Sequence, residues 1–105
     1  MSSNYSKGRS LEYTVRKKLQ ALGYTVFRCA GSRPVDLVAV KQSQILILEC
    51  KVGKHPSLPS KQLKRLLKIS REVNGFLMLA LRRRHQKIRW FRITEGGLKE
   101  LEEFP

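Results

Sequence analysis

Two short apolar runs separated by four polar residues constrain the fold of this chain more than any other feature. The runs are residues 35–40 (VDLVAV) and 45–51 (ILILECK), and residues 41–44 (KQSQ) lie between them. Because both runs are short and rich in β-branched residues, they predict two strands of a hairpin with residues 41–44 as its loop. In this hairpin Val40 faces Ile45, and the same pairing places Asp36 opposite Glu49.

This pairing brings two acidic side chains together on one face of a largely buried sheet. Facing residues of an antiparallel pair have Cβ atoms about 5 Å apart, and Lys51 points to the same face as Glu49. Adjacent buried carboxylates resist ionisation, and Mg²⁺ or Mn²⁺, which prefer hard oxygen ligands, would offset that cost. Such an ion activates water and neutralises phosphate charge. We favour this metal site over the alternative, a solvated strand end at which Glu49 simply pairs with Lys51.

The charge of the chain indicates a polyanionic partner. Its 105 residues are enough for a single domain, 1–105, and 22 Lys and Arg against 8 Asp and Glu give a net charge of +14. Nucleic acid is the most common partner of so basic a domain. A membrane partner is not expected, because the chain has no long apolar run and no signal peptide. Cys29 and Cys50 are too few for a zinc site and are expected to be reduced thiols, as is typical of a cytosolic protein.

The remaining segments predict helices and strands around the hairpin. The spacing of Leu11, Val15, Leu19 and Leu22 predicts a helix over 7–22, preceded by a flexible arm, 1–6. Further along we expect a strand over 24–29, a helix over 61–74, strands over 76–81 and 88–93, and a tail, 94–105, with a weak helix over 98–104. The order α-β-β-β-α-β-β predicts an α/β fold with a mixed central sheet flanked by helices. The helix between the third and fourth strands favours a right-handed parallel crossover.

Basic residues gather in two of these segments. The second helix has a basic stripe almost free of acids, and the turn over 82–87 contains Arg82, Arg83, Arg84 and Lys87. Solvated surfaces usually mix both signs of charge, so both segments favour contact with phosphates. The alternatives are a solvated helix face and a charged hairpin tip.

Several short motifs follow one another in a specific order. They are Lys7-Gly8 with Glu12, Ala30-Gly31-Ser32 leading into Asp36, and Glu49-Cys50-Lys51-Val52, followed by Ser70-Arg71 before Gly75 and a strand containing Trp90. Together they cover roughly residues 7–93 and resemble the archaeal Holliday junction resolvases of the PD-(D/E)XK nuclease superfamily. The resemblance implies a restriction-endonuclease-like fold. It also implies a metal-dependent endonuclease that resolves four-way DNA junctions by paired nicks in opposed strands.

The resemblance also implies roles for individual residues. Asp36, Glu49 and the backbone carbonyl of Cys50 would ligate Mg²⁺, for which Mn²⁺ could substitute, and Glu12 would complete the cluster directly or through water. Lys51 would orient or help deprotonate the attacking water, and Ser32 would contact the scissile strand. The DNA-binding residues expected from the resemblance and the basic segments are Lys7, Arg9, Arg28, Arg33, Lys54, Lys61, Arg82, Arg83 and Arg84.

The implied working unit is a homodimer in the cytoplasm, associated with the nucleoid, without a small-molecule cofactor. We expect its interface to use apolar positions of the second helix, such as Ile69 and Val73, with help near Trp90. Two alternatives remain open: a related nuclease that acts on another DNA structure or sequence, and a non-catalytic nucleic-acid-binding module. Taken singly, Glu12 could also be a surface acid paired with Arg16 or with Lys51.

Overall fold

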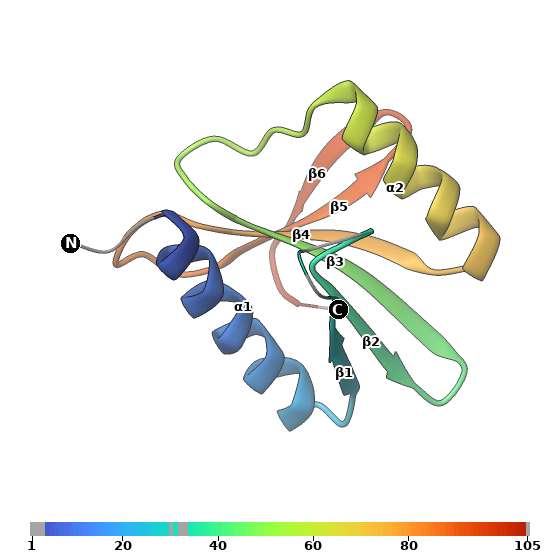
Figure 1. The fold of residues 1–105 in the computed structure, drawn as a ribbon, viewed down its shortest axis with the longest axis horizontal. Helices are drawn as coiled ribbons and strands as arrows, with labels where there is room; N and C mark the ends of the chain where they lie inside the picture. Colours follow the sequence, from blue (N-terminus) through green and yellow to red (C-terminus); the bar gives the residue numbers. More distant parts are fainter. Residues whose placement is uncertain (1–3, 30, 32–33, 105) are drawn as a thin grey trace.

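Six strands form one sheet in chain order, with one helix against each of its faces (Figure 1). The computed structural model describes residues 4–29, 31 and 34–104, with side chains from residue 8 onward. The elements are α1 (Asn4–Ala21), β1 (Thr25–Arg28), β2 (Leu37–Lys41), β3 (Gln44–Val52), α2 (Ser60–Val73), β4 (Phe76–Arg82), β5 (Arg89–Thr94) and β6 (Gly97–Leu101). The α/β class with a mixed, helix-flanked sheet is therefore confirmed.

The predicted hairpin register is confirmed, although its turn is tighter than expected. β2 pairs antiparallel with β3, and Val40 faces Ile45 as predicted. Lys41 and Gln44, placed in the loop by the sequence, also pair, so that Gln42 and Ser43 alone make the turn. Gln42 has a positive φ of 54°, which a two-residue hairpin turn requires. β3 and β4, connected through α2, are parallel, as the crossover predicted.

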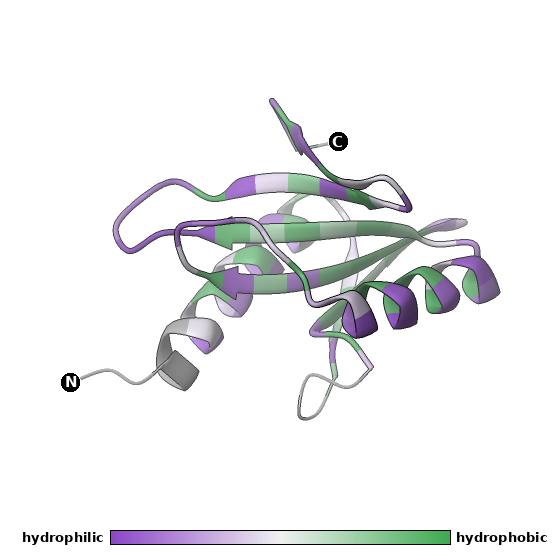
Figure 2. Ribbon diagram, turned by 90° about the horizontal axis from the view of Figure 1, so that it is seen from above, coloured by the Kyte–Doolittle hydropathy of each residue, from purple (hydrophilic) through white to green (hydrophobic). Residues whose placement is uncertain are grey.

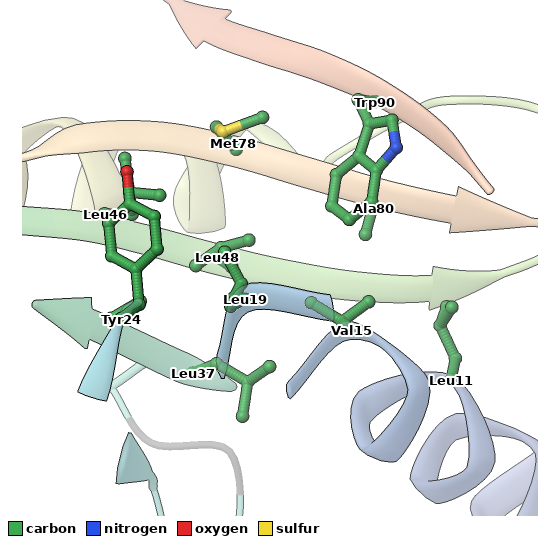
Figure 3. Close-up of a cluster of buried hydrophobic side chains, with 11 residues drawn as sticks. Leu11, Val15, Leu19, Tyr24, Leu37, Leu46, Leu48, Met78, Ala80 and Trp90 are labelled. Carbon is green, nitrogen blue, oxygen red and sulfur yellow. The ribbon is translucent and has the colours of Figure 1, made fainter. Parts of the chain in front are cut away.

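The apolar residues of the strands alternate between two cores, one under each helix. Leu11, Val15 and Leu19 of α1 are fully buried against one face, where they meet Leu48 and Ala80 among others (Figure 3). The face under α2 contains Leu66, Ile47, Leu77, Leu79 and Leu81. β4 contributes to both cores, which explains why its sequence is apolar throughout. Figure 2 shows this contrast between the hydrophobic strands and the mixed surface of α2.

The ends of the first helix differ from the prediction. α1 begins at Asn4, so that part of the expected flexible arm over 1–6 is helical, and residues 1–3 lie outside the described part. Leu22 was expected on the buried face, but it lies beyond the end of α1 and is 45% exposed. The helix stops there because Gly23 adopts a φ of 96°, which favours glycine.

The predicted C-terminal helix is wrong, because this segment adds a sixth strand. β6 pairs antiparallel with β5, and Leu101 faces Trp90. The Thr94 hydroxyl donates a hydrogen bond to the carbonyl of Gly97 across the turn. Trp90 is buried and its ring meets the ring of Phe104 edge-on, with centroids 4.7 Å apart. Trp90 therefore belongs to the core and not to an exposed apolar surface.

Among the described helices, none has the length and apolar character that crossing a membrane requires.

Candidate active site

Asp36 and Glu49 lie together on the α2 side of the sheet, as the hairpin register predicted. Asp36 directly precedes β2, and both carboxyl groups are almost completely buried, at 6% and 7% exposure. Two backbone contacts hold Asp36 in place. Its Oδ2 accepts a hydrogen bond from the backbone N–H of Cys50 at 2.7 Å, and its carbonyl accepts one from the N–H of Cys29 at 3.0 Å.

The Glu49 carboxyl group is strongly perturbed by this neighbourhood. Burial and the negative charge of Asp36 raise its pKa from 4.5 to about 8, while the positive charge of Arg65 acts in the opposite direction. Glu49 Oε2 accepts a hydrogen bond from Gln62 Nε2 at 3.0 Å, but the buried Oε1 has no partner among the described residues. A buried carboxylate oxygen without a donor is costly, and either a proton or a cation beside Oε1 would offset that cost.

A divalent cation fits these two carboxylates. Paired hard oxygen donors suit Mg²⁺ or Mn²⁺, and such an ion would satisfy Oε1 of Glu49 and reduce its repulsion with Asp36. Within the described ranges, no group of three or more His, Cys, Asp or Glu side chains is arranged to hold a metal. Further ligands would therefore be backbone carbonyls, such as that of Cys50, or water. The Cys50 thiol does not compete, because burial and then the charges of Asp36, Glu12 and Glu49 raise its pKa well above 9.

Glu12 belongs to α1, and like Asp36 and Glu49 it lies close enough to Cys50 for its charge to raise the pKa of that thiol. It is buried, at 8% exposure. Its Oε1 accepts a hydrogen bond from Arg28 Nε at 3.3 Å, and no described contact joins it to Arg16 or Lys51. Both alternative pairings are therefore wrong. Arg9, Arg16 and Arg28 surround Glu12 and Tyr13 in a hollow of about 360 Å³.

Lys51 is turned toward the loop that follows β3. Its Nζ donates hydrogen bonds to the carbonyl and the hydroxyl of Ser57, at 2.9 and 3.0 Å. A second, smaller hollow of about 150 Å³ is lined by Glu49, Lys51, Ser57 and Gln62. Lys51 therefore shares the space in front of Glu49 without pairing with it, which excludes the simple Glu–Lys pair.

Gln62 and Arg65 are site residues that the sequence did not reveal. Both lie on α2, one turn apart, where Gln62 hydrogen-bonds Glu49 and Arg65 lowers its pKa. Gln62 is an uncharged polar residue within a basic stretch of this helix. That interruption was an available signal, but the partner lies 13 residues earlier, so only the packing of α2 identifies it.

The predicted DNA-binding residues occupy several separate places. Lys54 and Arg83 line one hollow, Arg82 donates a hydrogen bond to the Ser10 hydroxyl at 3.4 Å, and Arg84 donates one to His85. Lys61 is exposed in the first turn of α2. Ser32, Arg33 and the side chain of Lys7 lie outside the described residues. Their assignments stay predictions.

Comparison with known proteins identifies relatives of this fold and sequence. A family model described as "Archaeal holliday junction resolvase (hjc)" matches residues 3–103. The curated protein "Crossover junction endodeoxyribonuclease Hjc" of Methanocaldococcus jannaschii is 32% identical over 84 residues, which cover 78% of this chain and 63% of that protein. The chain thus matches less than two thirds of the length of this relative.

A solved structure shares the fold. The structure of Archaeoglobus fulgidus Hjc, described as a Holliday junction resolvase from an archaeal hyperthermophile, matches with a TM-score of 0.73 at 23% identity. The match covers 93% of this chain and 85% of the solved one. At this identity the likeness shows the architecture, which includes the sheet and both flanking helices.

Proposed function

Since the chain belongs to the archaeal Holliday junction resolvase family, we propose that it is a metal-dependent endonuclease that cuts four-way DNA junctions. The observation that carries this proposal is the buried carboxylate pair. In this pair Oε1 of Glu49 lacks a hydrogen-bond donor, and the pKa of Glu49 is about 8. A non-catalytic DNA-binding module would have no use for so costly an arrangement. Its basic surface alone would be sufficient for binding.

Asp36 and Glu49 would hold Mg²⁺, or Mn²⁺ in its place, together with the carbonyl of Cys50. A bound ion would supply an activated water and positive charge on the scissile phosphate. Gln62 fixes one oxygen of Glu49 and leaves the other without a partner, so that it would be available to a metal ion. Second contacts of this kind orient metal ligands and tune their affinity.

Lys51 provides the mobile positive charge of the site. Its Nζ is hydrogen-bonded to the hydroxyl and the carbonyl of Ser57, an exposed residue of the loop after β3. A rotation of its flexible side chain would bring the ammonium group to the attacking water or to the developing phosphate charge. Glu12 holds Arg28 and would contact a bound ion through water, and Ser32 would contact the scissile strand.

DNA would be bound by the basic side chains that surround the site, with two subunits cutting opposed strands symmetrically. The cytoplasm, at the nucleoid, is the location that such a substrate implies. Cleavage of labelled junctions, flaps, duplexes and single strands with Mg²⁺ separates a junction resolvase from a nuclease for other DNA structures. Preferred, paired cuts in junctions support the proposal, and equal cutting of all substrates would contradict the junction specificity.

Two substitutions test the carboxylate pair directly. Asp36→Asn and Glu49→Gln should each abolish cutting and weaken Mn²⁺ binding, measured by titration, while junction binding in a gel shift persists because the basic surface is unchanged. Glu72→Gln is the matched control, since Glu72 is an exposed acid of α2 paired with Lys68. Cutting at the wild-type rate by either site variant would end the assignment of the active site.

A further inference from the structure

A basic hollow lies beyond the candidate active site, on the same side of the sheet. It has a volume of about 640 Å³ and lies between the loop after β3 and the turn between β4 and β5, which reach the same end of the sheet (Figure 1). Four cationic side chains line it: Lys54, Arg83, Lys87 and Arg89. None of its lining residues is acidic.

Three of these four cations are uncompensated. Arg89 is held by Glu100, with its Nε and Nη2 donating hydrogen bonds at 2.9 and 2.7 Å. The side chains of Lys54, Arg83 and Lys87 are exposed, and within the described part of the chain they enter no hydrogen bond or ion pair. Mutual repulsion in a shared hollow is relieved when an anion binds between them.

The position of the basic hollow relative to the carboxylate pair follows from β4. Leu79 pairs with Glu49 and lines the hollow in front of it, whereas Leu81 pairs with Lys51 and lines the basic hollow. Leu79 and Leu81 point to the same face, and two residues of a strand span about 7 Å. This step is comparable to the distance between successive phosphates of one DNA strand.

We propose that the basic hollow binds the backbone phosphate adjacent to the scissile one, on the strand that is cut. This inference rests on the proposed nuclease function and extends it, because an anchored neighbour determines which phosphate reaches Asp36 and Glu49. Arg83 and Lys87 make the contact. Of the three consecutive arginines, Arg82 is directed toward Ser10 of α1 and Arg84 toward His85, so that Arg83 alone faces the hollow.

Gly53 offers a test of the charge requirement that leaves the basic residues in place. It lines the hollow, a Cβ built on it meets nothing within 4 Å, and its φ lies outside the positive region. Gly53→Asp introduces a negative charge there, and Gly53→Asn introduces the same shape without charge. In metal-free junction binding, followed by fluorescence anisotropy, Asp should weaken affinity about tenfold, whereas Asn should bind as wild type. Equal affinities of the two variants would overturn the proposal.

Junctions with one neutral methylphosphonate linkage locate the bound phosphate. For wild type, a neutral linkage next to the cut should slow cutting about tenfold. For the double variant Arg83→Ala, Lys87→Ala, the same linkage should have no further effect, and the slope of log affinity against log salt should become shallower by about one. The matched control is Lys99→Ala, because Lys99 is exposed on β6 and faces Arg92 on the opposite side of the sheet.

The outcomes separate this inference from the proposed function. If wild type cuts junctions and the neutral linkage slows the double variant as much as wild type, the phosphate site is wrong and the nuclease assignment stands. If wild type cuts no DNA, the proposed function fails. The comparison of Gly53→Asp with Gly53→Asn in metal-free binding then still decides whether the basic hollow holds a phosphate.

Discussion

The Glu49 side chain links the acidity of the site to the stability of the fold. Its pKa in the folded protein, about 8, lies above the ordinary value of 4.5. The folded state therefore binds this proton more tightly than the unfolded state does. The stability contributed by the protonated group is fully present below pH 4.5 and is lost as the pH rises toward 8.

Metal-free protein should accordingly lose stability between pH values near 4.5 and near 8, and Glu49→Gln should flatten this loss because its amide does not ionise. Urea denaturation in the presence of a chelator, at both pH values, measures the difference. Mg²⁺ should restore stability mainly near pH 8, where metal and proton no longer compete. An identical pH dependence for wild type and Glu49→Gln would contradict the role of Glu49.

At the scale of elements, α2 and its connection to β4 position the carboxylate pair. Gly75, in this connection, packs closely against β3, the strand that contains Glu49. A Cβ on Gly75 would lie 2.9 Å from Cδ1 of Ile47 in that strand. Ile47 is buried, and it lies two residues before Glu49 on the same face. The contact leaves no room for a larger residue.

Gly75→Ala should therefore destabilise the fold by about 1–3 kcal/mol, the usual cost of overpacking. Gly8→Ala is the matched comparison. Gly8 lies within α1 with nothing within 4 Å of its Cβ position, and replacing glycine by alanine inside a helix stabilises by about 0.5–1 kcal/mol. Thermal unfolding should show a lowered Tm for the first variant and a raised Tm for the second. Equal shifts in one direction would show that the Ile47 contact has no effect.

The elements predicted from sequence are those whose partners lie nearby in the chain. The β2–β3 register was readable because both strands flank one turn, and their alternation fixes which residues face each other. The segment after Thr94 was misread, because Leu98 and Leu101 have a helical spacing. Its true partners, Trp90 and the β5 edge, were not visible locally. The same limit hid Gln62, which reaches Glu49 only after α2 folds back over the sheet.

At the scale of the whole molecule, exposed apolar side chains indicate where a second copy could bind. Val73 at the end of α2 is 43% exposed, whereas Ile69 packs partly into the core under α2. Phe27 of β1 is also exposed, and pairs with Val38 on the same side of the sheet. Trp90, predicted near a dimer interface, is instead buried. Val73 and Phe27 are thus the candidates for contact with a second copy.

Sedimentation at moderate salt should report twice the monomer mass of 12.2 kDa. Val73→Asp should shift it toward the monomer, because an unpaired charge in an apolar interface is costly, and should uncouple the two nicks of a junction. Lys18→Asp is the control, because it changes an exposed residue of α1 on the opposite side of the sheet. Val26→Asp is unsuitable as a control, since Val26 packs against the core. A stable wild-type monomer that still makes paired cuts would refute the dimer.

The strand order of the sheet has a consequence for aggregation. Every strand lies beside its neighbour in the chain, so that β1 and β6 are the two edges. β1 has four residues, and β6 places Lys99 and Glu100 along its exposed edge. Short and charged edges discourage pairing with strands of other molecules. The last strand thus covers the edge of β5, and a concentrated solution of this protein should resist assembly through its sheet.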